Sequence, residues 1–317
     1  MSRKSGRGFK NKSYFLIAIL NKNDLKYNKE KEKVLIMANL LDAIINITNN
    51  NIFELRDYAE SHNRANNMGE ALEEYIKDAF ANTFYEKDLA KRNLILSKTF
   101  SYLGNQNNPP DSMLINGDAI EVKKIESSTS SLALNSSYPK QKLFSHDQMI
   151  TSACRECEDW QEKDILYAVG EVNAPRLKSL SFVYGIDYCA SREVYERIKH
   201  TIKSGVEGIK GVEFSETKEL GRVNRVDPLG ITYLRVRGMW GIENPNQAFR
   251  YIYTIDPIKK FNLMAIINNE KYNKFDNRSK FESYLRTNKS IKLRDVSILN
   301  PDNPAKTIRA KLISFSV

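Results

Sequence analysis

The stretch PDSMLINGDAIEVKKI, residues 110–125, predicts two strands joined by a tight turn. The Asn-Gly pair at 116–117 is a strong hairpin signal, because both residues tolerate a left-handed backbone. Residues two apart on a strand share a face, so Glu121 and Lys123 place a carboxylate beside an ammonium group. A core strand has little use for that pair, whereas a metal-dependent catalytic strand needs it.

The catalytic interpretation makes a demand on the register of this hairpin. With a two-residue loop, Asp111 would pair with Val122 and face away from Glu121 and Lys123. A three-residue loop, with Gly117 in the left-handed region as a bulge, pairs Asp111 with Glu121 instead. The catalytic interpretation therefore predicts the three-residue loop, and a purely structural hairpin predicts no preference.

Cleavage of a phosphodiester by a divalent metal requires hard oxygen ligands and a means of activating water. Asp111 and Glu121 supply carboxylates, and the carbonyl of Val122 can add a third metal ligand. Lys123 suits a place beside the attacking water or the developing phosphate charge. Its role as a base or as an electrostatic stabiliser stays open at this point. A hydrated divalent metal ion is therefore the expected cofactor.

Outward from the hairpin, hydrophobic spacing predicts an α/β (α+β) fold, with a helix, a three-strand meander, a further helix and more strands. The expected helices are 34–47, 52–60, 68–84, 146–162 and 191–203, and the expected strands are 94–102, 111–115, 119–125, 164–172, 179–190 and 310–317. Between 205 and 247 no regular pattern persists. Glu73 falls at the border of the apolar face of the 68–84 helix.

The bulk composition restricts the class of partner. The net charge of +10 over 317 residues favours polyanions, nucleic acid first and an anionic membrane second. No apolar run approaches the roughly 20 residues that span a bilayer, and we expect no signal peptide and no membrane association. The three cysteines form no disulfide framework, which predicts a cytoplasmic protein. A Walker loop is missing, so we expect no nucleotide cofactor.

The pattern Pro110-Asp111 followed by Glu121-Val122-Lys123 resembles the PD-(D/E)xK nuclease signature. In that superfamily a preceding helix often offers a glutamate to the site, and Glu73, within GEALE at 69–73, stands at the matching place. The resemblance therefore adds Glu73 to the catalytic candidates. It also implies a restriction-endonuclease-like core, with a central mixed sheet flanked by helices and an embedded DNA-recognition region.

Three longer stretches narrow the resemblance to one group. They are NRANNMGEALEEYIKDAF (63–80), TFSYLGNQNNPPDSMLINGDAIEVKKIE (99–126) and LALNSSYPKQKL (132–143). Over about residues 60–150 they are similar to type II restriction endonucleases of the NgoPII group. The resemblance implies Mg²⁺-dependent cleavage of both strands of double-stranded DNA at a short GGCC-type palindrome, protecting the host from foreign DNA. A palindromic target calls for a two-fold homodimer with one active site per strand.

Two further regions are candidates for DNA contact. Hydroxyls, amides and lysines after the catalytic strand suit phosphate and sugar, with a solvated polar loop as the equal alternative. Arginines among glycines and aromatics further on suit guanine as a group, although a phosphate contact or a surface charge is the more common role of any single arginine. The first set is Asn135, Ser136, Ser137, Lys140 and Lys142, and the second is Arg222, Arg225, Arg235, Arg237 and, nearby, Arg250.

These features predict three regions along the chain: an N-terminal helical region at 1–60, a nuclease core at 60–200, and a DNA-recognition and C-terminal region at 200–317 packed on the core. Cys154 and Cys157 form a CxxC without a second pair, which favours two half-buried thiols over a zinc site. Two alternatives to a restriction enzyme remain: a PD-(D/E)xK nuclease of DNA repair or recombination, and a non-catalytic DNA-binding protein that shows the motif by chance.

Overall fold

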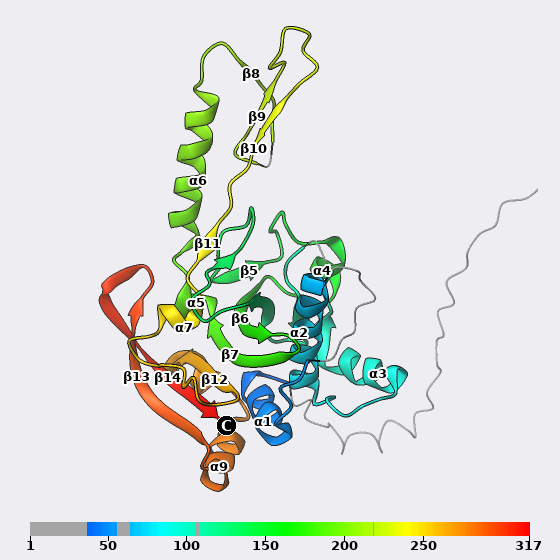
Figure 1. Cartoon of the computed structure of the whole chain (residues 1–317), viewed down its shortest axis with the longest axis vertical. Coiled ribbons are helices and arrows are strands. Elements are labelled where there is room, and N and C mark those ends of the chain that lie inside the picture. The colour runs from blue at the N-terminus through cyan, green and yellow to red at the C-terminus, as the bar shows by residue number, and fades with distance from the viewer. Residues whose placement is uncertain (1–36, 56–63, 106–107, 218) are drawn as a thin grey trace, which may run out of the picture. The chain divides into compact units, whose positions relative to one another are not determined.

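The computed structural model describes residues 37–55, 64–105, 108–217 and 219–317, which all belong to the unit Met37–Val317 (Figure 1). The helices in this part of the chain are α1 (Leu40–Asn50), α2 (Arg64–Ala81), α3 (Leu89–Thr99), α4 (Ser152–Glu156), α5 (Gly185–Tyr188), α6 (Arg192–Glu207), α7 (Pro245–Ala248), α8 (Asn269–Lys274) and α9 (Arg278–Thr287).

Strands of the described residues form one large sheet and two small ones. The strands of the large sheet are β1 (Phe100–Tyr102), β2 (Ser112–Leu114), β3 (Ala119–Ile125), β5 (Lys142–Phe144), β6 (Glu162–Asn173), β7 (Arg176–Tyr184), β12 (Asn262–Asn268), β13 (Ile291–Asn300) and β14 (Asn303–Ser316). Their order is β1-β2-β3-β6-β7-β12-β14-β13, and β5 pairs with β6 off this path. The β3–β6 and β7–β12 pairs are parallel, and the other pairs are antiparallel.

The small sheets join more distant segments. One has the order β10 (Leu234–Val236), β9 (Gly221–Asn224) and β8 (Glu213–Phe214), and the other pairs β11 (Gly241–Ile242) with β4 (Leu132–Ala133). The predicted mixed central sheet with flanking helices is therefore confirmed. The large sheet contains strands from both the predicted 60–200 core and the predicted 200–317 region, because β7 pairs with β12.

Apolar side chains cover both faces of β3, in alternation. Ile120 and Val122 join the cluster that includes α1 and α2, whereas Ala119 and Ile125 join a second cluster on the other face. The predicted apolar side of the 68–84 helix is buried in the first cluster, through Leu72, Tyr75, Ile76, Ala79 and Phe80. Glu121 and Lys123 share the parity of Ala119, so they interrupt the second cluster and leave room for a polar site.

Several predicted elements are confirmed, some with shifted bounds. The 119–125 strand is β3, the 111–115 strand is the shorter β2, the 164–172 strand lies inside β6, and the 310–317 strand is the end of β14. The 68–84 and 191–203 helices are α2 and α6, and the 34–47 helix is observed as α1, whose predicted start at 34–36 lies outside the described residues.

The strand predicted at 94–102 is wrong for most of its length, because α3 continues to Thr99. Asp88 starts this helix by accepting the backbone N–H groups of Ala90 and Lys91 at 2.9 and 3.2 Å. Arg92 then pairs with Asp78 of α2 at 2.7 Å, which fixes the helix against its neighbour. A cap and a buried ion pair override the strand-like apolar run.

Three other predictions are corrected. Ile52–Leu55 is not helical, because the Leu55 N–H donates to the Pro175 carbonyl at the β6–β7 turn (2.9 Å); residues 56–60 lie outside the described part. The 146–162 helix shrinks to α4, and β6 already begins at Glu162. The 179–190 strand ends at Tyr184, where the short helix α5 begins.

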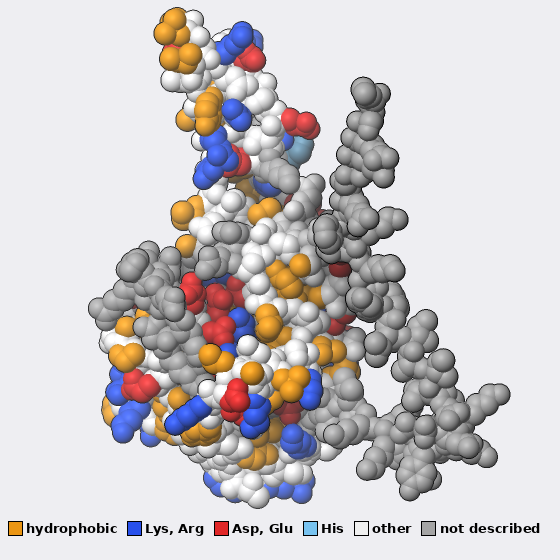
Figure 2. Space-filling view, turned by 90° about the vertical axis from the view of Figure 1, so that its right-hand side faces the viewer, with side chains coloured by type: hydrophobic (Ala, Val, Ile, Leu, Met, Phe, Trp, Pro, Cys, Tyr) orange, Lys and Arg blue, Asp and Glu red, His pale blue; other side chains and the backbone are white. Residues whose placement is uncertain are grey.

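Residues 191–240 form what we call the arm, which contains α6 and the β10-β9-β8 sheet and projects from the rest of the Met37–Val317 unit (Figure 1). Among the residues of α6, all of them described, none is buried. Lysine, arginine and apolar side chains are visible on the arm at the top of Figure 2. Its apolar residues include Leu229 and Ile231, whose exposed fractions are 81% and 76%.

Candidate active site

The β2–β3 hairpin adopts the register that the catalytic interpretation requires. Ser112 lies opposite Ile120 and Met113 opposite Ala119, which is the register of a three-residue loop, and Asp111 directly precedes β2. The prediction that Gly117 adopts the left-handed conformation is wrong, because Asn116 is the loop residue with a positive φ, of 51°.

A glycine is needed at position 117 because the Leu114 side chain leaves no space for a Cβ atom, and its backbone conformation does not require glycine. A Cβ atom on Gly117 would lie 2.9 Å from the Cβ of Leu114, and the Gly117 N–H donates to the Leu114 carbonyl at 3.0 Å. The Leu114 N–H in turn donates to the Asp118 carbonyl at 3.0 Å, so three residues remain in the loop. Asn116 is one of the few residue types that enter the left-handed region readily.

Asp111 is fixed by its own side chain and by its backbone. Its Oδ2 accepts the Val122 N–H at 2.6 Å, and its N–H donates to the Ile120 carbonyl at 3.1 Å. Gly104 has a φ of +80°, and a Cβ there would lie 2.2 Å from the Asp111 carbonyl oxygen. Only glycine therefore fits beside Asp111.

The charged groups of the hairpin form a tightly coupled set. Lys123 Nζ lies 2.5 Å from Glu121 Oε1. Burial, together with the neighbouring Glu121 and Glu73, raises the pKa of Asp111 to about 8, although Lys123 opposes the rise. Burial alone would lower the pKa of Lys123, but the attraction of Glu121 and Asp111 outweighs it and raises that pKa. Lys123 therefore stays an ammonium group at neutral pH.

Glu73 approaches this set from α2. Burial raises the pKa of its carboxyl group, Lys77 and Lys123 act against the rise, and Glu121 adds to it. These interactions mean that Glu73 senses the charges of β3 without a direct hydrogen bond to them among the described contacts. The structure thus brings all four catalytic candidates, three from the hairpin and one from α2, into one electrostatic neighbourhood.

Asp111, Glu121 and Lys123 line a cavity of about 340 Å³. Residues 133–138 and Lys140 also line this cavity, and we call them the pocket wall. Asn135, Ser136, Ser137 and Lys140 lie on this wall, as expected for residues beside a catalytic cleft. Lys142 does not line this cavity; it pairs with Glu162 at 2.5 Å and lines a different one.

Tyr167 is a pocket residue that the sequence reasoning missed. It lies on β6 opposite Glu121, and its hydroxyl accepts the Lys140 N–H at 2.8 Å and donates to the Lys140 carbonyl at 3.2 Å. The signal was weak, because a tyrosine within the apolar run DILYAVGEV looks like any other core residue. A buried tyrosine hydroxyl does require a polar partner, and that requirement was the available clue.

The candidate arginines lie apart from the cavity. Arg235 binds Glu219 through two nitrogens at 2.9 and 2.7 Å, and Arg237 binds the same carboxylate at 2.7 Å. The guanidinium of Arg222 lies over the Tyr233 ring, 4.4 Å from its centre, and Arg225 lies 3.8 Å from Glu213. These four belong to the arm, whereas Arg250 lies beyond it and lines a third cavity.

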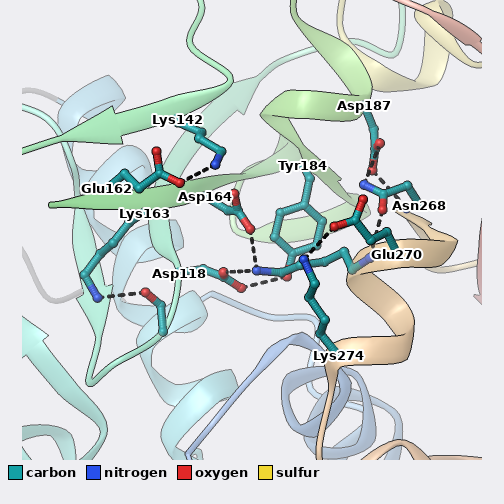
Figure 3. Close-up of polar contacts among 12 residues, drawn as sticks. Asp118, Lys142, Glu162, Lys163, Asp164, Tyr184, Asp187, Asn268, Glu270 and Lys274 are labelled. Carbon is teal, nitrogen blue, oxygen red and sulfur yellow. Dashed lines mark hydrogen bonds and ion pairs between the residues drawn. The ribbon is translucent and has the colours of Figure 1, made fainter. Parts of the chain in front are cut away.

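The larger cavity, of about 940 Å³, is lined by many charged side chains (Figure 3). Lys271 of α8 binds Asp118 at 2.5 Å and Asp164 at 2.7 Å, and the Tyr184 hydroxyl donates to Asp118 at 2.7 Å. These contacts tie α8 to the start of β3 and to β6. The two aspartates already have a cationic partner, which gives this network a structural role.

Among the described residues, no group of three or more His, Cys, Asp or Glu side chains is arranged to hold a metal ion. A metal at the hairpin would therefore be held by the two carboxylates of Asp111 and Glu121 with oxygens from elsewhere.

Cys154, Cys157 and Cys189 are free thiols, and burial raises the pKa of Cys154 to about 12. In the same part of the chain, every helix is too short or too polar to cross a membrane.

Comparison with known proteins covers the whole of this site. The family model of the NgoPII restriction endonuclease matches residues 38–299. The chain is also 55% identical over 278 residues to the type II restriction enzyme NgoPII of Neisseria gonorrhoeae, across 87% of this chain and 99% of the relative. No solved structure matches the chain. The matched residues include the hairpin, Glu73, the pocket wall and the arm.

Proposed function

The chain belongs to the NgoPII restriction endonuclease family, and from this premise we propose that Asp111, Glu121, Lys123 and Glu73 are its catalytic residues. A restriction endonuclease is a hydrolase that cuts DNA at specific sites, and it serves a restriction system. Family membership favours this function over a repair nuclease and over a non-catalytic DNA-binding protein.

The observation that carries the proposal is the shared cavity of Asp111, Glu121 and Lys123. Burial, and after it the neighbouring Glu121, raises the pKa of Asp111, and a cation beside the two carboxyl groups would favour their charged forms. Carboxylate and carbonyl oxygens are the ligands that Mg²⁺ prefers. We therefore assign Mg²⁺ to Asp111, Glu121 and the carbonyl of Val122. Bound Mg²⁺ polarises a phosphate and lowers the pKa of a water molecule.

The protein side chains supply the remaining chemistry. Because the pKa of Lys123 is raised, its ammonium group serves as a donor and electrostatic stabiliser for the attacking water and the phosphate. This assignment favours the stabiliser over the base, the alternative left open by the sequence. Glu73, with its raised pKa, is suited to hold a proton or a water molecule at the edge of the site.

DNA contacts are assigned to two groups of residues. We assign Asn135, Ser136, Ser137, Lys140 and Lys142 to phosphate and sugar, and Arg222, Arg225, Arg235 and Arg237 of the arm to bases or phosphates. The net charge of +10 supports a polyanionic substrate. A short GGCC-type palindrome is the proposed target, cut by a homodimer with one active site per strand. We also propose that the protein is cytoplasmic, which agrees with its free thiols.

The test replaces Lys123 or Asp111 with alanine. Cleavage of plasmid DNA in Mg²⁺ should fall by about a hundredfold or more, because charge stabilisation in the transition state is lost. Specific binding, measured by fluorescence anisotropy in Ca²⁺, should persist. Lys124→Ala is the matched control, since Lys124 is the next residue of β3 and pairs with Glu126 at 3.0 Å.

Cleavage at the wild-type rate by folded Lys123→Ala would rule out the catalytic assignment. Sequencing of the ends that the wild-type enzyme produces tests the GGCC target independently. Sedimentation of the enzyme with and without a short duplex tests the homodimer.

A further inference from the structure

Three aromatic rings meet where the arm joins the pocket wall. Tyr138 of the wall stacks on Tyr195 of α6, with ring centres 5.4 Å apart and planes 15° apart. Trp240, which ends the arm, meets both rings edge-on at 6.1 and 5.6 Å. The wall, the beginning of the arm and the end of the arm therefore share one apolar cluster.

Polar contacts reinforce the same junction. The Tyr138 hydroxyl accepts a hydrogen bond from Arg192 Nε at 3.1 Å and donates one to Glu196 Oε1 at 2.9 Å. Arg192 also pairs with Asp147, a buried carboxylate that Lys140 of the wall binds at 3.0 Å. The first turns of α6 are thus attached to the wall at two places.

The end of the arm is joined to the wall through the backbone. The Leu134 N–H donates to the Trp240 carbonyl at 2.8 Å, and the Trp240 N–H donates to the Asn135 carbonyl at 2.7 Å. The pairing continues in β11–β4, where Gly241 lies opposite Ala133. A movement of Trp240 would therefore move the wall with it.

The wall in turn contacts the catalytic strand. Lys140 exchanges two backbone hydrogen bonds with the Tyr167 hydroxyl, and Tyr167 lies beside Glu121 in the β3–β6 register. A Cβ on Gly185 would lie 2.2 Å from the Lys140 carbonyl oxygen, so this end of the wall fits closely against the body. Consecutive contacts thus lead from the arm to a catalytic carboxylate.

We propose that Tyr138 and Trp240 are positioning residues that couple DNA engagement by the arm to the geometry of the catalytic pocket. The inference rests on the proposed function, because it assigns the arm arginines to DNA. Binding of the arm to its correct target fixes α6 and Trp240, and their shared cluster fixes the wall that faces Asp111 and Glu121. An incorrect target leaves the wall displaced and slows cleavage more than binding.

Trp240→Leu tests the coupling, because it removes the indole and keeps both backbone hydrogen bonds of residue 240. Trp160→Leu is the matched control, because Trp160 is the other of the two tryptophans of the chain. Trp160 packs beside Cys154, and its ring nitrogen donates to the Cys154 carbonyl at 3.2 Å. The full-length enzyme is used throughout. The probes are a short duplex with the target that the wild type cuts and the same duplex with one base pair changed.

Trp240→Leu should bind the correct duplex in Ca²⁺ within about threefold of the wild type but cut it about tenfold more slowly in a single turnover, a size typical of such coupling. The ratio of its cleavage rates on the correct and the changed duplex, which measures its preference, should fall by a similar factor. Trp160→Leu should keep that preference, even if its melting temperature drops as much. A merely structural role of Trp240 would lower the melting temperature without altering the preference.

Tyr138→Phe keeps the ring stack and removes the hydroxyl, so it tests the same coupling if Trp240→Leu is unstable. The double variant should lose less than the two single variants together, because both act through one cluster. An unchanged preference in the folded variants, or equal losses in binding and cleavage, overturns the coupling alone. A folded wild type that cuts no DNA overturns the proposed function and the coupling with it.

Discussion

Replacing Asp111 with asparagine should stabilise the metal-free enzyme at pH 8 while removing its activity. The structure buries Asp111 beside Glu121 and raises its pKa to about 8. An amide of nearly the same shape carries no charge, and its oxygen can still accept the Val122 N–H that Asp111 Oδ2 accepts now. The substitution therefore removes the cost of a buried charge, together with its repulsion from Glu121, without removing the hydrogen bond.

The sign of the pH dependence follows from proton binding. The folded protein holds a proton on Asp111 up to about pH 8, whereas an unfolded aspartate releases it near its ordinary value of 3.8. Between these values the folded state binds more protons than the unfolded state, so stability falls as the pH rises. The asparagine variant lacks this loss, and its advantage over the wild type should therefore grow from pH 5 to pH 8.

The size of the effect has an upper limit. A full change of the pKa from 3.8 to about 8 would correspond to about 6 kcal/mol, at about 1.4 kcal/mol for each pH unit. Lys123 shares the interaction and loses part of its pairing in the variant, so we expect about 2 kcal/mol at pH 8. For a protein of this size that is a melting temperature higher by roughly 5 °C.

Differential scanning calorimetry in EDTA at pH 5 and pH 8 measures the difference. Added MgCl₂ should raise the melting temperature of the wild type at pH 8 and change that of the variant little, because binding to the folded state alone stabilises it. Asp118→Asn is the control with the opposite sign, since Asp118 is paired with Lys271 at 2.5 Å and its loss should destabilise. A lower melting temperature for Asp111→Asn at both pH values would refute the reasoning.

Three further predictions concern the residues around Asp111 and the binding of DNA. Glu73→Gln should slow cleavage by about tenfold instead of abolishing it, because Glu73 supports the site from α2; plasmid cleavage kinetics would measure this, and an unchanged rate would exclude the role. Gly104→Ala should lower both the melting temperature and the cleavage rate, since its Cβ would lie 2.2 Å from the Asp111 carbonyl, whereas Gly69→Ala, with no atom within 4 Å of the new Cβ, should be neutral or stabilising. DNA affinity by fluorescence anisotropy should fall steeply with salt, because phosphate contacts release counterions; a flat dependence would contradict those contacts.

The β2–β3 hairpin could be predicted because its information is local. The Asn-Gly turn, the alternation of β3 and the chemical requirement that Asp111 face Glu121 together indicate a three-residue loop, and the observed pairing has that register. The detail that failed was the conformation of Gly117. Sequence alone does not reveal that the Cβ of Leu114 occupies the space a side chain would need.

The elements that were mispredicted depend on distant partners. Ile52–Leu55 is extended because Leu55 bonds to Pro175, and α3 replaces a strand because Arg92 reaches Asp78 of α2. An apolar run of ten residues fits either a strand or a buried helix, and the partner decides. Tyr167 belongs to the same class, since only its contact with Lys140 distinguishes it from a core tyrosine.

The pocket combines a stable support with an unfavourable charge, and the two have a common origin. Val122 is buried in the apolar cluster beneath β3, while Glu121 and Lys123 on either side of it face the cavity. The burial that fixes this strand also raises the pKa of Asp111, so the rigid support comes with a cost for ionising that carboxyl group. A cation held by Asp111 and Glu121, as proposed, would offset this cost by favouring the charged form of Asp111. The raised pKa of Asp111 in the metal-free protein is therefore what the proposed metal assignment leads us to expect of this carboxyl group.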